Sequence, residues 1–394
     1  MKSGWAIKKL GEVCELIGGG TPSIHESSYY GGNIPWATVR DMNCRVIEKT
    51  ERTITRKGLE NSASNVIPAG NVIISTHVGL GKVCFVAQDT AINQDLKGVI
   101  PFADNIQKTF LYYWFLSIAD YLEKSGTGST VRGVKLDFVK SLELPIPPLH
   151  EQKRIVAKID AAFEKIDKLK ANAERNLANA KELFQSALDE AMRPKKGWME
   201  KRLGEVYNFI DYRGKTPNKI NEGVPLVTAR NIRMGYLDYA VRDFISQTEY
   251  KTRQSRGIAR KGDILFTTEA PLGFVALADL EEFSTGQRVI TFQQYKGSEQ
   301  HLLNEFYFYY FQANGFQGEI RKQATGATAQ GIKASRLREI PVAVVPYTEQ
   351  QSIVKRLDIL AEKTKSLEQH YTRQIADCSE MRQSVLREAF EGRL

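Results

Sequence analysis

Apolar residues recur at every third or fourth position along two long stretches of the chain, residues 151–193 and 349–391, and neither stretch contains Gly or Pro. Each therefore predicts an α-helix about 64 Å long, at an α-helical rise of about 1.5 Å per residue. The spacings alternate between four and three over about five heptads, which favours a coiled coil over ordinary amphipathic helices that cover a core. The expected apolar positions are Ile155, Ile159, Ala162, Ile166, Leu169, Ala173, Ala180, Leu183 and Ala187 in the first stretch, and Ile353, Leu357, Leu360, Leu367, Tyr371, Cys378, Met381 and Val385 in the second, with polar residues at Asn176, Thr364 and Gln374.

A different pattern fills the segment before each long helix. Short apolar runs such as residues 71–75 and 264–268 are bounded by Gly and Pro, which predicts β-strands. One helix per segment is expected, near residues 110–124 and 302–317. The fold class is therefore α+β, with a mixed α/β domain followed by a long helix.

This plan occurs twice. Residues 5–13 (WAIKKLGEV) recur as residues 198–206 (WMEKRLGEV), and G-V-K at 133–135 recurs as G-I-K at 331–333. The sequence therefore predicts a tandem duplication. The expected divisions are globular domains at residues 1–150 and 197–348 and helical segments at residues 151–196 and 349–394.

Composition narrows the class of protein. The chain carries a net charge of +9, yet the two helical stretches are nearly neutral, with nine Lys/Arg against eight Asp/Glu in the first and seven against eight in the second. The basic excess therefore belongs to the globular segments and suits a polyanionic partner. The hydrophobic content of 42% excludes disorder as the main state, and no apolar stretch is long enough to span a membrane. Four dispersed cysteines without a C-x-x-C pair, and the lack of a signal-peptide core, indicate free thiols and a cytoplasmic location.

Motifs for catalysis are missing from the sequence. The glycine-rich phosphate loop, the G-x-S-x-G elbow, the H-E-x-x-H pair, the dinucleotide-binding G-x-G-x-x-G and the amino-methyltransferase Asn/Asp-Pro-Pro-aromatic tetrapeptide are all absent. Only His77 invites attention among the five histidines, but Glu269 takes its place in the second copy. We therefore expect no catalytic site, no metal and no cofactor in this chain.

Nucleic acid is the remaining candidate ligand. Polar and basic residues follow the predicted strand ends at matched positions of the two copies, where side chains extend from a rigid scaffold. Arg can read guanine, Asn and Gln can read adenine, and Thr, Lys and backbone amides can hold phosphates. The candidates for DNA binding are Thr38, Arg40, Asp41, Asn43, Thr76, His77, Gln94, Thr127, Ser129, Arg132 and Lys135 in the first copy, and Thr228, Arg230, Asn231, Arg233, Thr268, Glu269, Gln287, Arg288, Thr325, Thr328, Gln330 and Lys333 in the second.

The doubled arrangement resembles the DNA-specificity subunit of type I restriction–modification enzymes. The resemblance covers essentially the whole chain. It rests on residues 5–13 and their copy, the G-T-P turn at 20–22, P-I-P-P-L-H-E-Q at 145–152 and L-R-E-A-F-E-G-R-L at 386–394. The second copy departs from the Pro-Pro-Leu-x-Glu-Gln element, with V-P-Y-T-E-Q at 345–350.

The resemblance implies two target-recognition domains that each read one half of an asymmetric, bipartite site in double-stranded DNA. It also implies that the long helices pack as an antiparallel coiled coil, set the gap between the half-sites and dock two adenine methyltransferase subunits. Restriction subunits would join this complex, so S-adenosylmethionine and ATP are expected in the partners only. Apolar residues outside the heptad positions either dock the methyltransferases or thicken the helical core: Val156, Phe163, Phe184, Leu188, Ile359, Leu386 and Phe390.

Two alternatives stay open at the level of sequence. One is a two-headed scaffold that binds RNA or protein without serving a methyltransferase. The other is the specificity subunit of a phage-defence system that methylates DNA without cutting it, because restriction would reside in another chain.

Overall fold

The computed structural model describes residues 5–127, 132–214, 216–295, 301–326 and 330–394. Their contacts form two compact units, Met1–Glu174 with Thr372–Leu394, and Arg175–Tyr371. Each unit joins parts of two long helices to a head of strands and short helices. The first head comprises residues 5–148 and the second head residues 198–346. No helix among the described residues is long and apolar enough to cross a membrane.

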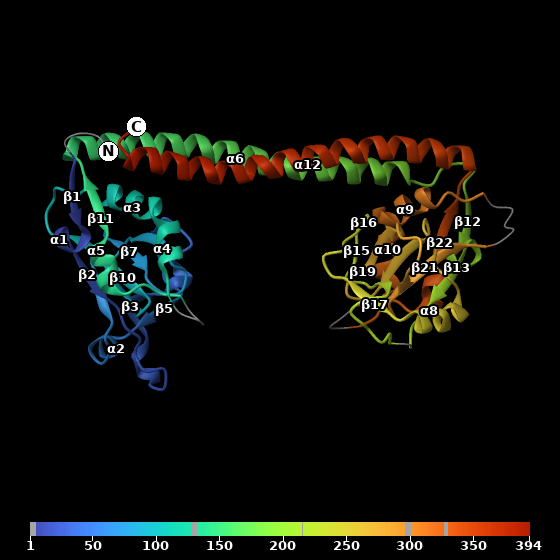
Figure 1. Ribbon diagram of the computed structural model, residues 1–394, viewed down its shortest axis with the longest axis horizontal. Coiled ribbons are helices and arrows are strands. Elements are labelled where there is room, and N and C mark those ends of the chain that lie inside the picture. The colour runs from blue at the N-terminus through green and yellow to red at the C-terminus, as the bar shows by residue number, and fades with distance from the viewer. Residues whose placement is uncertain (1–4, 128–131, 215, 296–300, 327–329) are drawn as a thin grey trace. The chain divides into compact units, whose positions relative to one another are not determined.

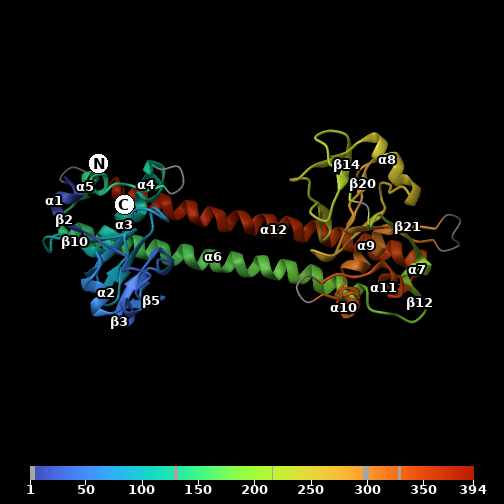
Figure 2. The ribbon, with the colours of Figure 1, turned by 90° about the horizontal axis from the view of Figure 1, so that it is seen from below.

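The two predicted long helices are confirmed as α6 (Leu149–Ala191) and α12 (Tyr347–Phe390). In the first unit, the start of α6 runs antiparallel to the end of α12 (Figures 1 and 2). Two contacts show this direction: Asp167 pairs with Arg382, and the earlier Arg154 donates from Nη2 to the carbonyl of the later Leu394 at 2.7 Å. In the second unit, the end of α6 and the start of α12 run antiparallel as well. There Lys195, just beyond α6, pairs with Glu349 at 3.1 Å, and Leu188 and Leu357 share one core.

The heptad prediction is right for one of its two positions. For the other position it holds at Ile155 and Ile353, both 1% exposed, but fails further along each helix. Ile159, Ile166, Ala173 and Ala180 are buried as expected. Leu169 and Leu183, however, are 54% and 53% exposed, and Leu367 and Met381 of α12 are 40% and 47% exposed. The inward positions are instead those of Phe163 and Phe184.

The heads explain this shift. Phe163 packs edge-on against Tyr113 with ring centroids 5.6 Å apart, and Phe184 packs against Tyr309 at 6.2 Å. On α6, Phe163 therefore faces the first head and Phe184 the second, while Leu169 and Leu183 face solvent. The periodicity of the helix sequence alone cannot show that Tyr113 and Tyr309 of the heads pack against it.

The first head is built on a five-stranded sheet of order β2-β10-β7-β8-β4 and a four-stranded sheet of order β5-β3-β9-β6. A third pairing, β1 with β11, joins the two ends of the head. The strands are β1 (Ala6–Lys9), β2 (Cys14–Gly18), β3 (Tyr30–Ala37), β4 (Val46–Ile47), β5 (Arg52–Ile54), β6 (Asn65–Ile67), β7 (Val72–Ser75), β8 (Val83–Val86), β9 (Thr90–Ile92), β10 (Leu96–Pro101) and β11 (Glu143–Ile146). The helices are α1 (Leu10–Val13), α2 (Arg56–Glu60), α3 (Lys108–Ser117), α4 (Ala119–Ser125) and α5 (Leu136–Ser141), with 3-10 turns η1 (Ser27–Tyr29) and η2 (Val39–Asp41).

The second head repeats this plan with a four-stranded sheet of order β13-β21-β18-β19 and a three-stranded sheet of order β17-β14-β20. Its strands are β12 (Met199–Arg202), β13 (Tyr207–Asp211), β14 (Val224–Val227), β15 (Ile232–Arg233), β16 (Tyr236–Leu237), β17 (Asp243–Ile245), β18 (Ile264–Thr268), β19 (Leu272–Leu277), β20 (Ser284–Thr285), β21 (Val289–Gln294) and β22 (Pro341–Val344). Its helices are α7 (Leu203–Val206), α8 (Gln247–Arg253), α9 (Asn304–Gln312), α10 (Asn314–Gln323) and α11 (Ala334–Arg338), with the 3-10 turn η3 (Gln254–Arg256).

The single helix expected in each head is in fact two consecutive helices, α3 and α4 in the first head and α9 and α10 in the second. In the second head the break lies at Ala313, whose backbone is extended. The next residue, Asn314, donates from its amide and from Nδ2 to Asp189 of α6, both at 2.7 Å. A carboxylate from another element thus caps α10, and sequence periodicity cannot anticipate such a partner.

A buried glutamine fixes the start of each long helix to its head. Gln152 accepts a hydrogen bond from the Gln107 amide at 2.8 Å and donates to two carbonyls, those of Asn105 at 2.8 Å and Pro147 at 2.9 Å. Gln350 makes the equivalent three bonds, with the Leu303 amide and the His301 and Val345 carbonyls, at 2.7, 3.1 and 2.7 Å. The Glu-Gln element that recurs in the sequence is therefore the joint between head and helix.

Candidate nucleic-acid interface

Three segments of the first head meet beyond the end of β7. The Thr76 amide donates to the Asp95 carbonyl in the loop before β10, at 2.8 Å. The Val134 amide donates to the Thr76 carbonyl at 2.8 Å, which attaches the turn that leads into α5. Thr127 and Gly133 close that turn with two backbone bonds of 3.0 Å.

The second head repeats these bonds one for one. The Thr268 amide donates to the Arg288 carbonyl at 3.0 Å, and the Ile332 amide donates to the Thr268 carbonyl at 3.0 Å. Thr325 and Gly331 close the turn with two bonds of 2.9 Å. We call the described parts of the three joined segments the tip of each head: residues 76–77, 93–95, 127 and 132–135 in the first, and 268–269, 286–288, 325–326 and 330–333 in the second.

A fourth segment borders each tip. In the first head the Asn93 amide donates to the Ala37 carbonyl at 3.0 Å, and in the second the Gly286 amide donates to the Val227 carbonyl at 2.8 Å. These bonds bring the turns that begin at Thr38 and Thr228 beside the tips. The segments that carry the described candidate residues, which are far apart in sequence, thus lie next to one another in each head.

The Thr-Pro turn also reaches the tip. Thr21 Oγ1 donates to Gln94 Oε1, and Thr216 Oγ1 donates to Gln287 Oε1 at 3.2 Å. Thr21-Pro22 therefore recurs as Thr216-Pro217 for a structural reason, because the threonine of each turn orients the tip glutamine of its head.

Several expected DNA contacts have structural roles instead. Thr76, Thr268 and Asn231 are only 1%, 3% and 2% exposed. The two threonine hydroxyls donate to the Asp95 and Arg288 carbonyls within their own tips, at 3.1 and 3.2 Å. The prediction that these three side chains contact bases or phosphates is corrected. The two threonines are already bonded within the tips, and Asn231 is bonded within the turn that begins at Thr228.

Asn231 illustrates why. Its Oδ1 accepts from the amide and the hydroxyl of Thr228, at 2.9 and 2.8 Å, and its Nδ2 donates to the Asp238 and Val241 carbonyls, at 3.1 and 2.7 Å. In the first head Asp41 takes the same position and accepts from the amide and hydroxyl of Thr38, at 2.8 and 3.0 Å. This pattern is a capping motif that shapes the turn, so Thr38, Asp41 and Thr228 are positioning residues here as well.

The other described candidates remain available to a ligand. Ser129 and Thr328 lie outside the described residues. The exposed members are Arg40, Asn43, His77, Gln94, Thr127, Arg132 and Lys135 in the first head, and Arg230, Arg288, Thr325, Gln330 and Lys333 in the second, with Arg233, Glu269 and Gln287 half-buried. Their contact with DNA stays a prediction.

Ion pairs hold the arginines of the second head. Arg230 lies 2.9 Å from Asp243, which also pairs with Lys219 at 2.7 Å. Burial alone would raise the pKa of the Asp243 carboxyl, but the hydrogen bonds and positive charges of Lys219 and Arg230 outweigh burial and lower that pKa. Arg288 pairs with Glu269 at 2.9 Å. These arginines are therefore charged and preoriented before any ligand arrives.

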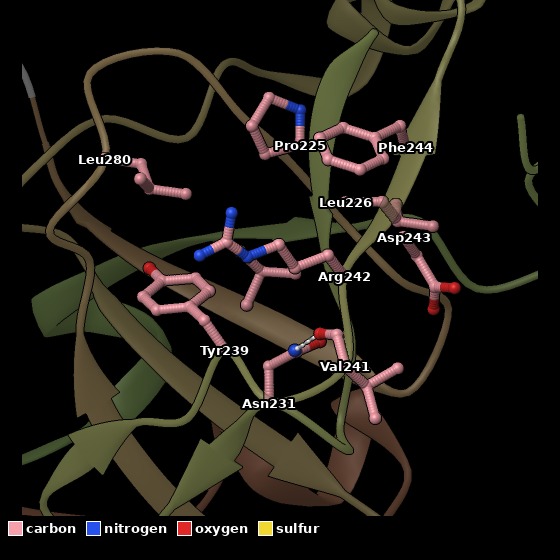
Figure 3. A pocket seen from close by; sticks show the side chains of 10 residues that line it. Pro225, Leu226, Asn231, Tyr239, Val241, Arg242, Asp243, Phe244 and Leu280 are labelled. Carbon is pink, nitrogen blue, oxygen red and sulfur yellow. Dashed lines mark hydrogen bonds between the residues drawn. The ribbon is translucent and has the colours of Figure 1, made fainter. Parts of the chain in front are cut away.

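A pocket of about 250 Å³ lies next to the Arg230 turn (Figure 3). Pro225, Phe244 and Leu280 contribute apolar walls, and Figure 3 shows the Arg242 side chain extending among them and Asn231 bonded to the Val241 carbonyl. The pocket wall thus includes the buried Asn231, which supports its role in shaping the turn.

The side chains expected to dock a partner on the helices are mostly covered by the heads. Val156, Phe163, Leu188 and Leu386 are buried, and Phe184 and Phe390 are half-buried against the same cores. This favours the other reading of these six residues, a thicker core shared by head and helices. Of the expected set, Ile359 alone is exposed, at 48%.

Sequence reasoning missed the apolar residues that the helices do expose. Leu169 and Leu367 are 198 positions apart, as are Leu183 and Met381. The first unit therefore exposes Leu169 and Met381, and the second exposes Leu367 and Leu183 at the equivalent places. The sequence shows the offset of 198, but the heptad pattern places these four residues in the buried contact between the helices.

Comparison with known proteins gives the same picture as this repeated architecture. The family model for the type I restriction modification DNA specificity domain matches residues 2–177 and again residues 195–376. The specificity subunit of the type I restriction enzyme MjaIX of Methanocaldococcus jannaschii is 25% identical over 385 residues, which cover 91% of this chain and 87% of that protein.

Solved structures share the fold. A structure from work on complex assembly and conformational transition of the type I R-M system aligns with a TM-score of 0.80 at 22% identity, covering 100% of this chain and 99% of that chain. The crystal structure of the HsdS subunit from Thermoanaerobacter tengcongensis aligns with a TM-score of 0.59 at 22% identity, covering 100% and 98%. With one family match on each half of the repeated sequence, the chain belongs to the family of type I restriction modification DNA specificity domains.

Proposed function

We propose that this chain is the DNA-reading subunit of a type I restriction–modification complex and that each head contacts one half of an asymmetric, bipartite site in double-stranded DNA. One observation carries the proposal. The two tips share their backbone hydrogen bonds but differ in their exposed side chains. Two copies of one scaffold with different side chains are suited to two different half-sites.

The exposed residues divide by chemistry into two roles. Threonines, lysines and tip amides, such as Thr127 and Lys135 or Thr325 and Lys333, suit phosphate contacts that set the position on the duplex. His77, Gln94, Arg230, Gln287 and Arg288 carry the donors and acceptors that base edges match. The target-recognition domains, proposed as residues 1–150 and 197–348, thus supply both affinity and specificity.

Catalysis belongs to other chains in this proposal. Two adenine methyltransferase subunits would bring S-adenosylmethionine, and restriction subunits would bring ATP, so this chain needs neither. The complex would work in the cytoplasm, where the DNA is. The helical segments, residues 151–196 and 349–394, would space the heads and hold the methyltransferase subunits.

The exposed apolar pairs on the helices are the proposed docking surface. Leu169 with Met381 and Leu183 with Leu367 are each 40–54% exposed, and each pair combines both helices within one unit. Exposed leucines at two equivalent places suit two copies of one apolar partner surface. Two methyltransferase subunits fit that count.

The test is sequence-resolved mapping of N6-methyladenine in DNA of the source cell, with and without this chain. We expect one two-part motif with a fixed gap to lose methylation when the chain is deleted and to regain it on complementation. A map that is the same in both cells would contradict the proposal.

A further inference from the structure

The backbone bonds of the tips define which residues occupy equivalent positions. The amide of Thr76 bonds the Asp95 carbonyl, and the amide of Thr268 bonds the Arg288 carbonyl. Asp95 and Arg288 therefore correspond, although their sequence offset differs from that of the neighbouring turn. His77 and Glu269, the next residues after the two threonines, correspond in the same way.

Glycine packing supports this equivalence. A Cβ placed on Gly133 would lie 2.7 Å from Cδ2 of His77, and one placed on Gly331 would lie 3.3 Å from Cβ of Glu269. Each of these two glycines admits the strand-end side chain at the same place in its tip. In each head the side chain that follows the strand, His77 or Glu269, thus packs against the matched glycine of the turn, where a side chain would leave less room.

The two heads carry their acidic side chain at different ones of these positions. The first head has His77 at the strand end and the acid Asp95 in the loop, where its carboxylate accepts from Asn93 Nδ2 at 2.9 Å. The second has the acid Glu269 at the strand end and the base Arg288 in the loop, with Arg288 Nε 2.9 Å from Glu269 Oε1. Both side chains of this second pair remain about half exposed, at 52% for Arg288 and 47% for Glu269.

We propose, building on the proposed function, that Arg288 and Glu269 together read one G·C base pair in the half-site of the second head. Arg288 donates through its two terminal Nη groups to O6 and N7 of guanine, and Glu269 accepts from the N4 amino group of the paired cytosine. The Nε–Oε1 contact then persists and keeps the donor and the acceptor side by side.

The chemistry of base edges selects this pair. In the major groove a G·C pair presents two adjacent acceptors on guanine next to a donor on cytosine, which a neighbouring arginine and glutamate complement. An A·T pair offers only one acceptor on its purine and places the thymine methyl group beside the carboxylate. The preformed ion pair also lowers the ordering cost of the arginine when DNA binds.

The experiment uses the full chain co-expressed with the methyltransferase subunits of its source cell. The complex methylates a plasmid library in which the recognised site is randomised one position at a time, and sequencing gives the fold-penalty for each base change. We expect the wild type to penalise replacement of one G·C pair in the second head's half-site about tenfold or more. In Arg288→Ala and in Glu269→Ala that one penalty should fall to about threefold or less, with all other positions unchanged.

Arg202 and Glu339 provide a matched control. They form an arginine–glutamate pair of 2.8 Å in the same head, with side chains 64% and 61% exposed, and neither residue lies in the tip. Arg202→Ala and Glu339→Ala should leave every penalty unchanged. Arg288→Lys keeps the charge but removes the fork of donors, so it should relax the same single position even where Arg288→Ala methylates too weakly to be read.

Different results overturn different claims. If the wild-type complex shows no preference for a two-part site, the proposed function itself is wrong. If the wild type shows that preference but Arg288→Ala and Arg288→Lys keep all penalties, relax an A·T position, or relax the half-site of the first head, the inference about this pair is wrong. Loss of methylation at every site with both Arg288 variants, while the controls stay active, would also overturn it.

Discussion

Single residues of the tips and of the turns beside them, which begin at Thr38 and Thr228, divide into those that shape the backbone and those that face solvent. Asn231 is the clearest case, because an asparagine beside an exposed arginine has the composition of a base-reading pair. In the structure all its polar groups serve the turn, and the neighbouring Arg230 is the exposed member. Residue type and position in sequence do not distinguish a side chain that shapes the turn from one that faces solvent. Only the surrounding carbonyls, which bond Asn231, distinguish the two roles.

This division predicts different outcomes for adjacent substitutions. Asn231→Ala removes a buried side chain that satisfies four polar groups, so we expect a loss of about 1–3 kcal/mol in the free energy of unfolding. Arg230→Ala should change that free energy by less than about 0.5 kcal/mol, yet relax methylation at the second half-site alone. Chemical denaturation and methylation mapping measure the two effects, and equal destabilisation by both variants would contradict the assignment.

A second prediction concerns the glutamine joint between head and helix. Gln350→Ala removes a fully buried side chain and leaves one amide and two carbonyls of the joint without this partner, which should cost about 2–4 kcal/mol of unfolding free energy. The adjacent Gln351 is exposed, so Gln351→Ala should be nearly neutral. If the two variants denature alike, the joint does not carry the stability argued for it.

At the scale of elements, the sequence predicts the long helices and the duplication well, because these depend on periodicity and repeats, while the antiparallel pairing comes from the family resemblance. It predicts one heptad position correctly, and the other only at Ile155 and Ile353. Phe163 and Phe184 pack against Tyr113 and Tyr309 of the heads and therefore face inward. Contacts of this kind join residues far apart in sequence, and the same reason applies to the break before Asn314, which Asp189 caps.

The helix faces give a prediction about stoichiometry. Leu183→Glu with Leu367→Glu should remove one of two docking places, so that the chain binds one methyltransferase subunit instead of two in native mass spectrometry. Adding Leu169→Glu with Met381→Glu should abolish binding. Gln369→Glu places a charge on an exposed position of the same helix and should retain two subunits. Two bound subunits in the fourfold variant would contradict the docking surface.

The start of α12 gives a prediction about pH. Trp198 Nε1 donates to Glu349 Oε2 at 2.9 Å, and this bond, with Lys195, lowers the pKa of the Glu349 carboxyl despite partial burial. A lowered pKa in the folded state stabilises the fold fully above the ordinary glutamate pKa of about 4.3 and loses that effect as the pH falls through the folded value. The Tm difference between wild type and Trp198→Phe should therefore shrink from pH 6 to below pH 4. A constant difference would show that the hydrogen bond does not set this pKa.

At the scale of the whole molecule, α6 and α12 each continue from one compact unit into the other. Insertion of one heptad into both helices adds about 10 Å. We expect this to lengthen the gap between half-sites by about three base pairs, at roughly 3.4 Å per step, while both half-sites keep their sequences. An unchanged gap would mean that the helices do not act as the spacer.

The central claim is that one chain reads two half-sites for a methyltransferase it does not contain. The most direct measurement is the N6-methyladenine map of the source cell, compared with a deletion strain and with a strain that carries Arg230→Ala. We expect one bipartite motif with a fixed gap, which is lost on deletion and relaxed in only one half by the substitution. A methylation map that does not depend on this chain, or a substitution that changes both halves equally, would contradict it.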